Sequence, residues 1–136
     1  MKKLAVFCLA LGLTTTVSFA QKLNAGKVPA AVKTAFAKKH GTAMKVSWEL
    51  EKANYEAGFT LDGKEVSEVY TAKGVLVESE TEIKVTELPE TIKVKLKGQK
   101  IAEAAKITRA DGSVVYEAEV KGKDLLFDAK GNPIKS

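Results

Sequence analysis

Tyr55-Glu56-Ala57-Gly58-Phe59 decides the fold, because the chain carries this stretch twice. It leads to a turn ending in Ala-Lys-Gly at 72–74, and the same order returns as Tyr-Glu-Ala-Glu-Val at 116–120 and Ala-Lys-Gly at 129–131. A shorter block precedes each copy, Val-Pro-Ala-Ala-Val-Lys at 28–33 and Leu-Pro-Glu-Thr-Ile-Lys at 88–93. The sequence therefore predicts a tandem duplication, with repeat one at 28–83 and repeat two at 86–136.

The first repeat begins with a helical pattern and continues with strand patterns. Val28, Val32 and Phe36 have the spacing of one helical face, Pro29 stands in the first turn and Gly41 follows as a stop, which predicts a helix over 29–40. The apolar period then falls to two, and strands are expected over 44–50, 55–61, 64–70 and 75–83. Asp62-Gly63 is a hairpin signal between the second and third of these strands.

The second repeat has the same order of elements. Leu88, Ile92 and Leu96 form a helical stripe, and Thr86 is placed to cap that helix. Strands are expected over 101–109, 114–121, 123–128 and 133–135. The predicted class is α+β, with two α-β-β-β-β repeats forming one eight-stranded antiparallel sheet and both helices packed on one face, because about 50 residues with one short helix bury too little core alone.

The N-terminus has the pattern of a secretory signal peptide. Lys2 and Lys3 precede an apolar run over 4–13, and Ser18-Phe19-Ala20 supplies the small residues that a signal peptidase requires. The sequence predicts a signal peptide at 1–20, cleavage between Ala20 and Gln21, and a periplasmic or secreted protein. The apolar run is shorter than the roughly 20 residues that span a bilayer, so no stable membrane anchor is expected after cleavage. A flexible lead-in is expected at 21–27, followed by one domain at 28–136.

Composition and spacing argue against most kinds of chemistry. The net charge falls from +5 to +3 when Lys2 and Lys3 leave, and no clustered basic face indicates nucleic acid. The only cysteine, Cys8, leaves with the signal peptide, so a disulfide is excluded and no zinc site is expected. His40, the only histidine, is interpreted as a solvated helix-end residue, and Asp128 to Asn132 as a β-turn rather than a calcium loop. No catalytic residue, metal or cofactor is predicted, and the protein is not expected to be an enzyme.

Three features carry a resemblance to a known family: the two helix starts, the Tyr-Glu-Ala strands and the ending Phe127-Asp128-Ala129-Lys130-Gly131-Asn132-Pro133-Ile134. In these features the chain resembles the exported PepSY-like proteins, a group also called β-lactamase-inhibitor-like. The resemblance covers the whole chain after the signal peptide. It implies two α-β4 units, and a protein that binds an enzyme with the open face of its sheet. The inhibitor that gives the group its name uses aromatic residues there, whereas this chain has charged ones.

The expected function is a non-catalytic exported module that binds or inhibits another envelope or secreted protein through the open sheet face. The alternative is a periplasmic sensor of a small ligand or of envelope stress. Strand phase places five charged residues on the open face as the expected protein-binding site: Glu49, Glu56, Lys106, Glu117 and Glu119. A solvated face without a partner is the structural alternative, since antiparallel sheets often leave one face to water. The sequence does not indicate an oligomeric state.

Overall fold

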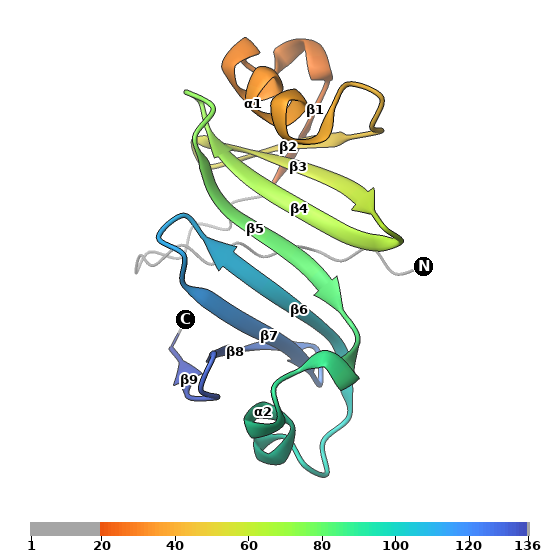
Figure 1. Cartoon of the computed structure of the whole chain (residues 1–136), viewed down its shortest axis with the longest axis vertical. Helices are drawn as coiled ribbons and strands as arrows, with labels where there is room; N and C mark the ends of the chain where they lie inside the picture. Colours follow the sequence, from red (N-terminus) through yellow and green to blue (C-terminus); the bar gives the residue numbers. More distant parts are fainter. Residues whose placement is uncertain (1–19, 136) are drawn as a thin grey trace.

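A nine-stranded antiparallel sheet dominates the structure, a computed structural model that describes residues 20–135 (Figure 1). The strands lie in chain order: β1 (Gln21–Leu23), β2 (Ser47–Glu51), β3 (Asn54–Leu61), β4 (Lys64–Thr71), β5 (Leu76–Ile83), β6 (Ile101–Arg109), β7 (Val114–Val120), β8 (Lys123–Asp128) and β9 (Pro133–Ile134). Two α-helices accompany them, α1 (Ala30–His40) and α2 (Glu90–Lys95), each after a short 3₁₀ helix, η1 (Ala25–Lys27) or η2 (Val85–Glu87). The predicted signal peptide falls on residues 1–19, outside the described part, and on Ala20.

Short turns join the strands from β2 to β5 and from β6 to β9. Between β3 and β4 the turn residues Asp62 and Gly63 have φ angles of 51° and 76°, which glycine and aspartate adopt more readily than most residues. The hairpin predicted there is therefore confirmed. The link between the two halves of the chain is β5, which pairs with β4 on one side and with β6 on the other. The class is α+β, and the sheet is open at β1 and β9.

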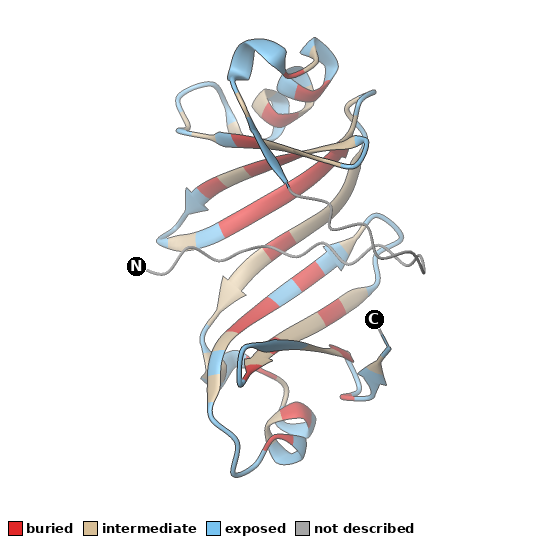
Figure 2. Ribbon diagram, turned by 180° about the vertical axis from the view of Figure 1, so that it is seen from behind, coloured by how far each residue is buried: buried red, intermediate tan, exposed pale blue. Residues whose placement is uncertain are grey.

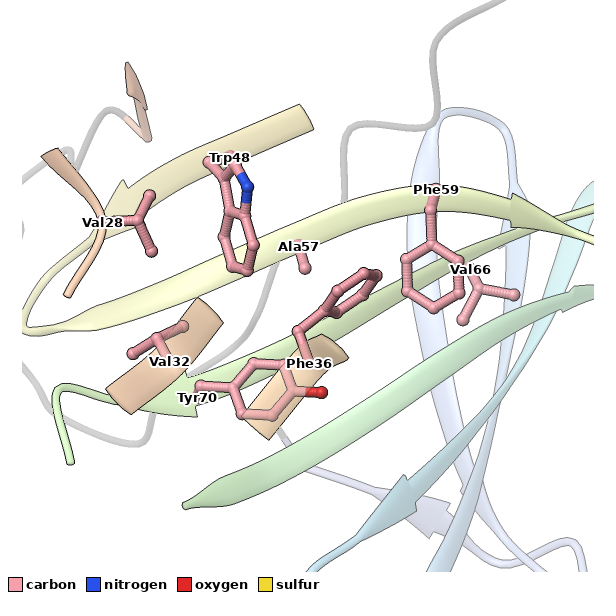
Figure 3. Close-up of a cluster of buried hydrophobic side chains, with 8 residues drawn as sticks. All are labelled: Val28, Val32, Phe36, Trp48, Ala57, Phe59, Val66 and Tyr70. Carbon is pink, nitrogen blue, oxygen red and sulfur yellow. The ribbon is translucent and has the colours of Figure 1, made fainter. Parts of the chain in front are cut away.

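A first hydrophobic cluster joins α1 to β2, β3 and β4 (Figure 3). Val32 and Phe36 of α1 are buried against strand residues, and the Phe36 ring contacts Trp48 edge-on at a centroid distance of 5.6 Å. The Phe36 ring also meets Phe59 at 5.1 Å. Edge-to-face contacts of this kind stabilise beyond the area they bury. The aromatic residues Phe36, Trp48, Phe59 and Tyr70 of this cluster are all buried.

A second cluster joins α2 to β6, β7 and β8. Leu88, Ile92 and Leu96, the stripe predicted from the sequence, are buried with Phe127 and with strand residues Ala104, Ala118 and Val120. Tyr116 packs against this cluster as a partly buried residue. Neither helix of residues 20–135 is long and apolar enough to cross a membrane.

The N-terminal part of the fold differs from the prediction. Residues 21–27 are not an unstructured lead-in, because Gln21–Leu23 forms β1 and pairs with β2, which gives the sheet nine strands rather than eight. Three residues are too few for a periodic pattern, so the sequence carries no strand signal there. Asn24 then caps η1 by accepting a hydrogen bond from the Gly26 N–H at 3.1 Å. Strand β2 begins at Ser47, three residues later than expected.

The start of the second helix also differs. Thr86 does not cap α2, because it lies inside η2, and α2 begins only after Pro89 with no side-chain cap. Instead, the Glu87 carboxylate accepts a hydrogen bond from the Lys84 N–H at 2.7 Å and so satisfies the start of η2. The 3₁₀ helix η2 therefore contains Thr86, the residue at which the sequence predicted the start of the second helix.

Candidate functional site

Glutamates from several strands lie on one face of the sheet, which we call the acidic face; they include Glu49, Glu56, Glu78, Glu80 and Glu117. Strand register establishes this, since residues directly opposite in neighbouring antiparallel strands share a face. Glu49 lies opposite Glu56, Glu56 opposite Val69, and Val69 opposite Glu78. Along β5 the period of two puts Glu78 and Glu80 on the same face, and Glu80 lies opposite Ile107. Glu117 reaches this face because it lies opposite Ala105, two residues from Ile107 on β6.

Four of the five predicted site residues lie on the acidic face. Glu49, Glu56 and Glu117 are defined above, and Glu119 follows Glu117 by one strand period and lies opposite Asp124. Lys106 does not lie there, because its register partners are Thr81 and Tyr116, on the opposite face. The placement of Lys106 on the open face was therefore wrong, and the reason is physical. A register shift between Ile101 and Ala104 reverses the phase of β6, as a bulge does, and this shift leaves no clear pattern in the sequence.

The acidic face is unusually buried for a face that carries so many carboxylates. Glu80 is 5% exposed and Glu56 is also buried, together with the apolar residues Val69, Ala105, Ile107 and Val115. Figure 2 shows that buried stretches lie in the central strands of the sheet. Register puts Ile107 next to Glu80 and Val115 next to Ile107, so apolar side chains lie directly beside the buried carboxylate. In the described part of the chain, Oε1 of Glu80 is buried without a hydrogen-bond partner. Such an acceptor is costly to leave unsatisfied.

Burial and mutual repulsion raise the pKa values of these carboxyls. Burial, followed by the charges of Glu117, Glu78 and other acids, raises the pKa of Glu80 to about 8. Burial and the nearby charges of Glu49 and Glu51 raise the pKa of Glu56 to about 7. The pKa of Glu117 is raised to about 7 by burial and by the charges of Asp124 and Glu119. The three groups are therefore partly protonated at neutral pH and would gain from a cation brought among them.

Cations are present only towards the margins of this face in residues 20–135. Arg109 lies opposite Glu78 and forms an ion pair with it, Nε to Oε2 at 3.5 Å. Lys22 of β1 lies opposite Glu49 and is exposed. Neither pair includes Glu80.

A second polar cluster lies on the side of the sheet that packs against α1. Glu68 of β4 is 1% exposed and accepts hydrogen bonds from Lys39 Nζ at 2.6 Å and from the Tyr70 hydroxyl. His40 Nε2 lies 3.0 Å from the other carboxylate oxygen. The interpretation of His40 as a solvated residue was wrong, because its side chain is 8% exposed and its ring lies against Phe36 and Phe59. Both carboxylate oxygens of Glu68 have partners, two of them on the helix, so the cluster attaches α1 to the sheet.

Burial would raise the pKa of Glu68, but the hydrogen bonds from Lys39, Tyr70 and His40 lower it on balance. Glu68 thus stays ionised at neutral pH, in contrast to Glu80. Two buried glutamates on opposite faces of one sheet therefore have opposite environments: both carboxylate oxygens of Glu68 have hydrogen-bond partners, whereas Oε1 of Glu80 has none among the described residues.

No metal centre is formed in residues 20–135, where no three His, Cys, Asp or Glu side chains are arranged to hold an ion. The Asp128 carboxylate accepts hydrogen bonds from the N–H groups of Lys130 and Asn132 and from the Asn132 amide, at 2.8 to 2.9 Å. Its oxygens are occupied by the turn itself, as an Asx turn requires.

Sequence reasoning missed the two most buried acids, although each leaves a signal. Glu78, Glu80 and Glu82 recur with the period of a strand, which places three carboxylates on one face. Glu68 stands in the apolar phase of its strand, between Val66 and Tyr70. A charged residue in the apolar phase indicates a buried partner.

The overall arrangement is known from other proteins. No protein-family model and no curated protein sequence matches this chain. Among solved structures, a proposed periplasmic protein from Bacteroides eggerthii is similar with a TM-score of 0.73 at 21% identity, over 79% of this chain and 86% of that one. A DUF2874 family protein from Bacteroides uniformis gives 0.71 at 20% identity, over 79% and 86%. A BLIP-like protein from Bacteroides fragilis gives 0.66 at 20% identity, over 79% and 84%. At these identities the likeness establishes a shared fold.

Proposed function

We propose that this protein is an exported, non-catalytic module that binds another envelope or secreted protein across its acidic face. The observation that carries the proposal is the buried carboxyl group of Glu80, whose Oε1 has no hydrogen-bond partner among the described residues and which lies among like charges. A solvated face of charged residues would instead leave each carboxylate hydrated. Similarity to a BLIP-like protein and to a proposed periplasmic protein supports both the kind of function and the export.

A non-catalytic role agrees with the chemistry of both polar clusters. On the acidic face the Ser67 hydroxyl bonds to Glu56, but Ser67 is buried, whereas a hydrolase needs an accessible nucleophile beside its base or an activated water. On the other side, His40 and Tyr70 both bond to Glu68, and the side chains of all three are buried. That arrangement favours a structural role for the only histidine.

The same proposal includes two α-β4 units whose helices cover one face of the sheet. The supporting observation is that the order of elements repeats. In the first half η1, Pro29 and α1 precede four strands, and in the second half η2, Pro89 and α2 precede four strands. The residues under the two helices, Ala57 and Ala118 among them, have the strand phase opposite to that of Glu56 and Glu117. The helices then leave the acidic face free for a partner.

An affinity pull-down from the native envelope and culture medium tests the function. The bait is residues 21–136, as wild type and as Glu56→Lys plus Glu117→Lys. The matched control, Asp62→Lys plus Glu90→Lys, changes the net charge equally at exposed sites away from the acidic face. Position 62 tolerates lysine, since Lys52 and Lys121 already occupy positive φ in this chain. Bait folding is checked by circular dichroism.

We expect wild type and control to retain the same partner protein and the face variant to lose it. Equal recovery by all three baits would show that the acidic face is not the binding surface. Recovery of no protein by any bait would favour the alternative, a sensor of a small ligand.

A further inference from the structure

We propose that Asp62 is a modification site: in the folded protein its side chain closes on the Gly63 nitrogen and is converted, through a succinimide, into isoaspartate, whereas Asp111 is protected from the same reaction. Aspartate precedes glycine only twice in the chain, at 62–63 and at 111–112. The two turns therefore provide an internal comparison. The inference concerns the turn between β3 and β4 and does not rest on the proposed function.

The reaction needs water but no cofactor, oxidant or reductant. The Gly63 nitrogen attacks Cγ of Asp62 and forms an N–Cγ bond in a five-membered ring, while the carboxyl hydroxyl leaves as water with the amide proton. A water molecule then opens the ring at one of its two carbonyl groups. Opening at Cγ restores aspartate. Opening at the main-chain carbonyl breaks its bond to nitrogen and yields isoaspartate, in which the chain runs through Cγ.

Both reacting groups are unoccupied at the turn between β3 and β4. Asp62 and Gly63 are exposed, and nothing beyond the chain neighbours lies within 4 Å of a Cβ built on Gly63. Within residues 20–135, neither the Asp62 carboxylate nor the Gly63 N–H takes part in a hydrogen bond or ion pair. The turn lies at the tip of the hairpin, where backbone motion is least restrained (Figure 1). The carboxyl group can therefore reach the Gly63 nitrogen without breaking an interaction.

Both reacting groups of the other pair are held in place. The Gly112 N–H donates a hydrogen bond to the Arg109 carbonyl oxygen at 2.9 Å, and the Asp111 carboxylate accepts one from the Ser113 N–H at 2.8 Å. These bonds direct the carboxylate towards Ser113 rather than towards the glycine nitrogen, as in an Asx turn. Asp111 must give up both bonds before the ring can close.

Protonation acts in the same direction. The ring closes from the protonated carboxyl group, because its hydroxyl is the leaving group. Hydrogen bonds from the side chain and the N–H of Ser113 lower the pKa of Asp111, which reduces the protonated fraction at a given pH. The environment of Asp111 thus protects it by geometry and by charge state.

Isoaspartate at position 62 would lengthen the backbone of a two-residue turn by one methylene group. The turn requires positive φ at both residues, 51° at Asp62 and 76° at Gly63, and it joins Leu61 to its register partner Lys64. Lys64 also forms an ion pair with Glu87 of η2 at 3.1 Å. The modification would therefore disturb both the hairpin and a contact between the two halves of the chain, and we expect it to lower thermal stability.

The test is incubation of residues 21–136 for several weeks at about pH 6, in folded form and in concentrated urea. Electron-transfer mass spectrometry of proteolytic peptides distinguishes isoaspartate from aspartate, and hydroxylamine traps the succinimide. In the folded protein we expect isoaspartate to accumulate at position 62 at least about tenfold faster than at position 111, since two hydrogen bonds hold the second pair. In urea the two pairs should react at similar rates.

Asp62→Glu is the matched variant, because it keeps the charge but would require a six-membered ring that closes far more slowly. It should abolish modification at position 62 and leave position 111 unchanged. Equal or faster reaction at position 111 in the folded protein would overturn the inference. Reaction at position 62 only in urea would overturn it as well, because the folded turn would then hold the two groups apart.

The expected loss of stability is measured on the modified protein itself. Ion-exchange chromatography separates the chain carrying isoaspartate from the unmodified chain, and circular dichroism compares their thermal unfolding. We expect the modified chain to unfold at a lower temperature. Identical unfolding of the two forms would show that the turn absorbs the added methylene group, and would contradict the effect on the hairpin.

Discussion

Glu68 links α1 to the sheet, since it binds Lys39 and His40 of the helix and Tyr70 of its own strand. Glu68→Ala should lower the free energy of unfolding by roughly 3 to 5 kcal/mol, because it leaves a buried tyrosine hydroxyl and imidazole without a partner. Lys39→Ala is the control and should cost roughly 1 kcal/mol or less, since Lys39 is about half exposed. Urea denaturation at neutral pH measures both. Equal costs would contradict the role given to the buried network.

The sign of the pH effect at Glu68 is fixed by its environment. The pKa of Glu68 in the folded protein lies below its ordinary value. Its contribution to the free energy of unfolding is therefore complete above the pKa that Glu68 has in the unfolded chain, and is lost as the pH falls through the folded pKa. The wild-type free energy of unfolding should therefore decline below about pH 4.5, and Glu68→Gln should decline less steeply.

Gly74 explains why Ala-Lys-Gly occurs in both halves. Its φ angle is 80°, and a Cβ added there would lie 2.5 Å from the carbonyl oxygen of Ala31 in α1. Gly131, with φ 83°, would meet Thr91 of α2 at 2.7 Å in the same way. Each glycine thus lets a strand turn pack against the start of a helix.

Gly74→Ala should destabilise the fold by roughly 2 to 4 kcal/mol, because it adds both positive-φ strain and a clash with backbone. Gly63→Ala is the matched control. Its φ angle is 76°, but nothing lies within 4 Å of the added Cβ, so only the strain of roughly 1 kcal/mol remains. Thermal unfolding followed by circular dichroism compares the two. Similar losses of stability in both variants would show that the close approach of Gly74 to α1 does not contribute to stability.

At the scale of elements, the sequence predicts the strands well because their pattern is local. Alternation and turn residues place β3 to β8 within about a residue of their observed limits, and the stripe of α2 is buried as predicted. The errors arise where tertiary contacts decide. Pairing with β2 creates β1, a register shift reverses the phase around Lys106, and packing over Glu68 buries His40. None of these has a period that can be read from neighbouring residues.

The element that couples the halves is β5, and cutting after it should expose the coupling. Residues 21–84 would retain β1 to β5 and α1 but leave the edge of β5 without β6, including the pairs from Glu78 opposite Arg109 to Ile83 opposite Ala104. An unpaired edge favours aggregation. We expect this fragment to be aggregated or marginally stable. Dispersed amide NMR signals from a stable monomer would instead show that the first half folds independently.

At the scale of the whole molecule, charge is separated between faces. Acids concentrate on one sheet face, while lysines lie along both helices, such as Lys33 on α1 and Lys93 on α2. The positive net charge of the chain thus conceals an acidic surface, and only strand phase shows it in the sequence. Four of the predicted site residues could be placed this way. Glu80, the most buried carboxyl group of the acidic face, could not be distinguished from the neighbouring glutamates in the sequence, since its burial depends on strands far apart in the chain.

The acidic face should make the protein less stable in alkaline solution. The pKa values of Glu56, Glu80 and Glu117 in the folded protein, about 7, 8 and 7, lie above the value of an unfolded glutamate. Between the unfolded and folded pKa values the folded state holds more protons than the unfolded chain. The free energy of unfolding therefore falls as the pH rises through the folded values. Glu80→Gln should raise it by roughly 2 to 4 kcal/mol at about pH 8.5 and change it little at about pH 5. Urea denaturation at both pH values measures this. A loss of stability at the higher pH would contradict the repulsive environment of Glu80.

Site-specific photo-crosslinking in the native envelope tests most directly whether the acidic face binds a protein. A photoreactive phenylalanine analogue would replace Ser47, an exposed residue in the register row of Glu80, or Lys33, an exposed residue of α1. The account predicts a discrete crosslinked protein from position 47, lost when Glu56→Lys and Glu117→Lys are added, and none from position 33. The same adduct from position 33 alone, or from both positions regardless of the charge reversals, would contradict it.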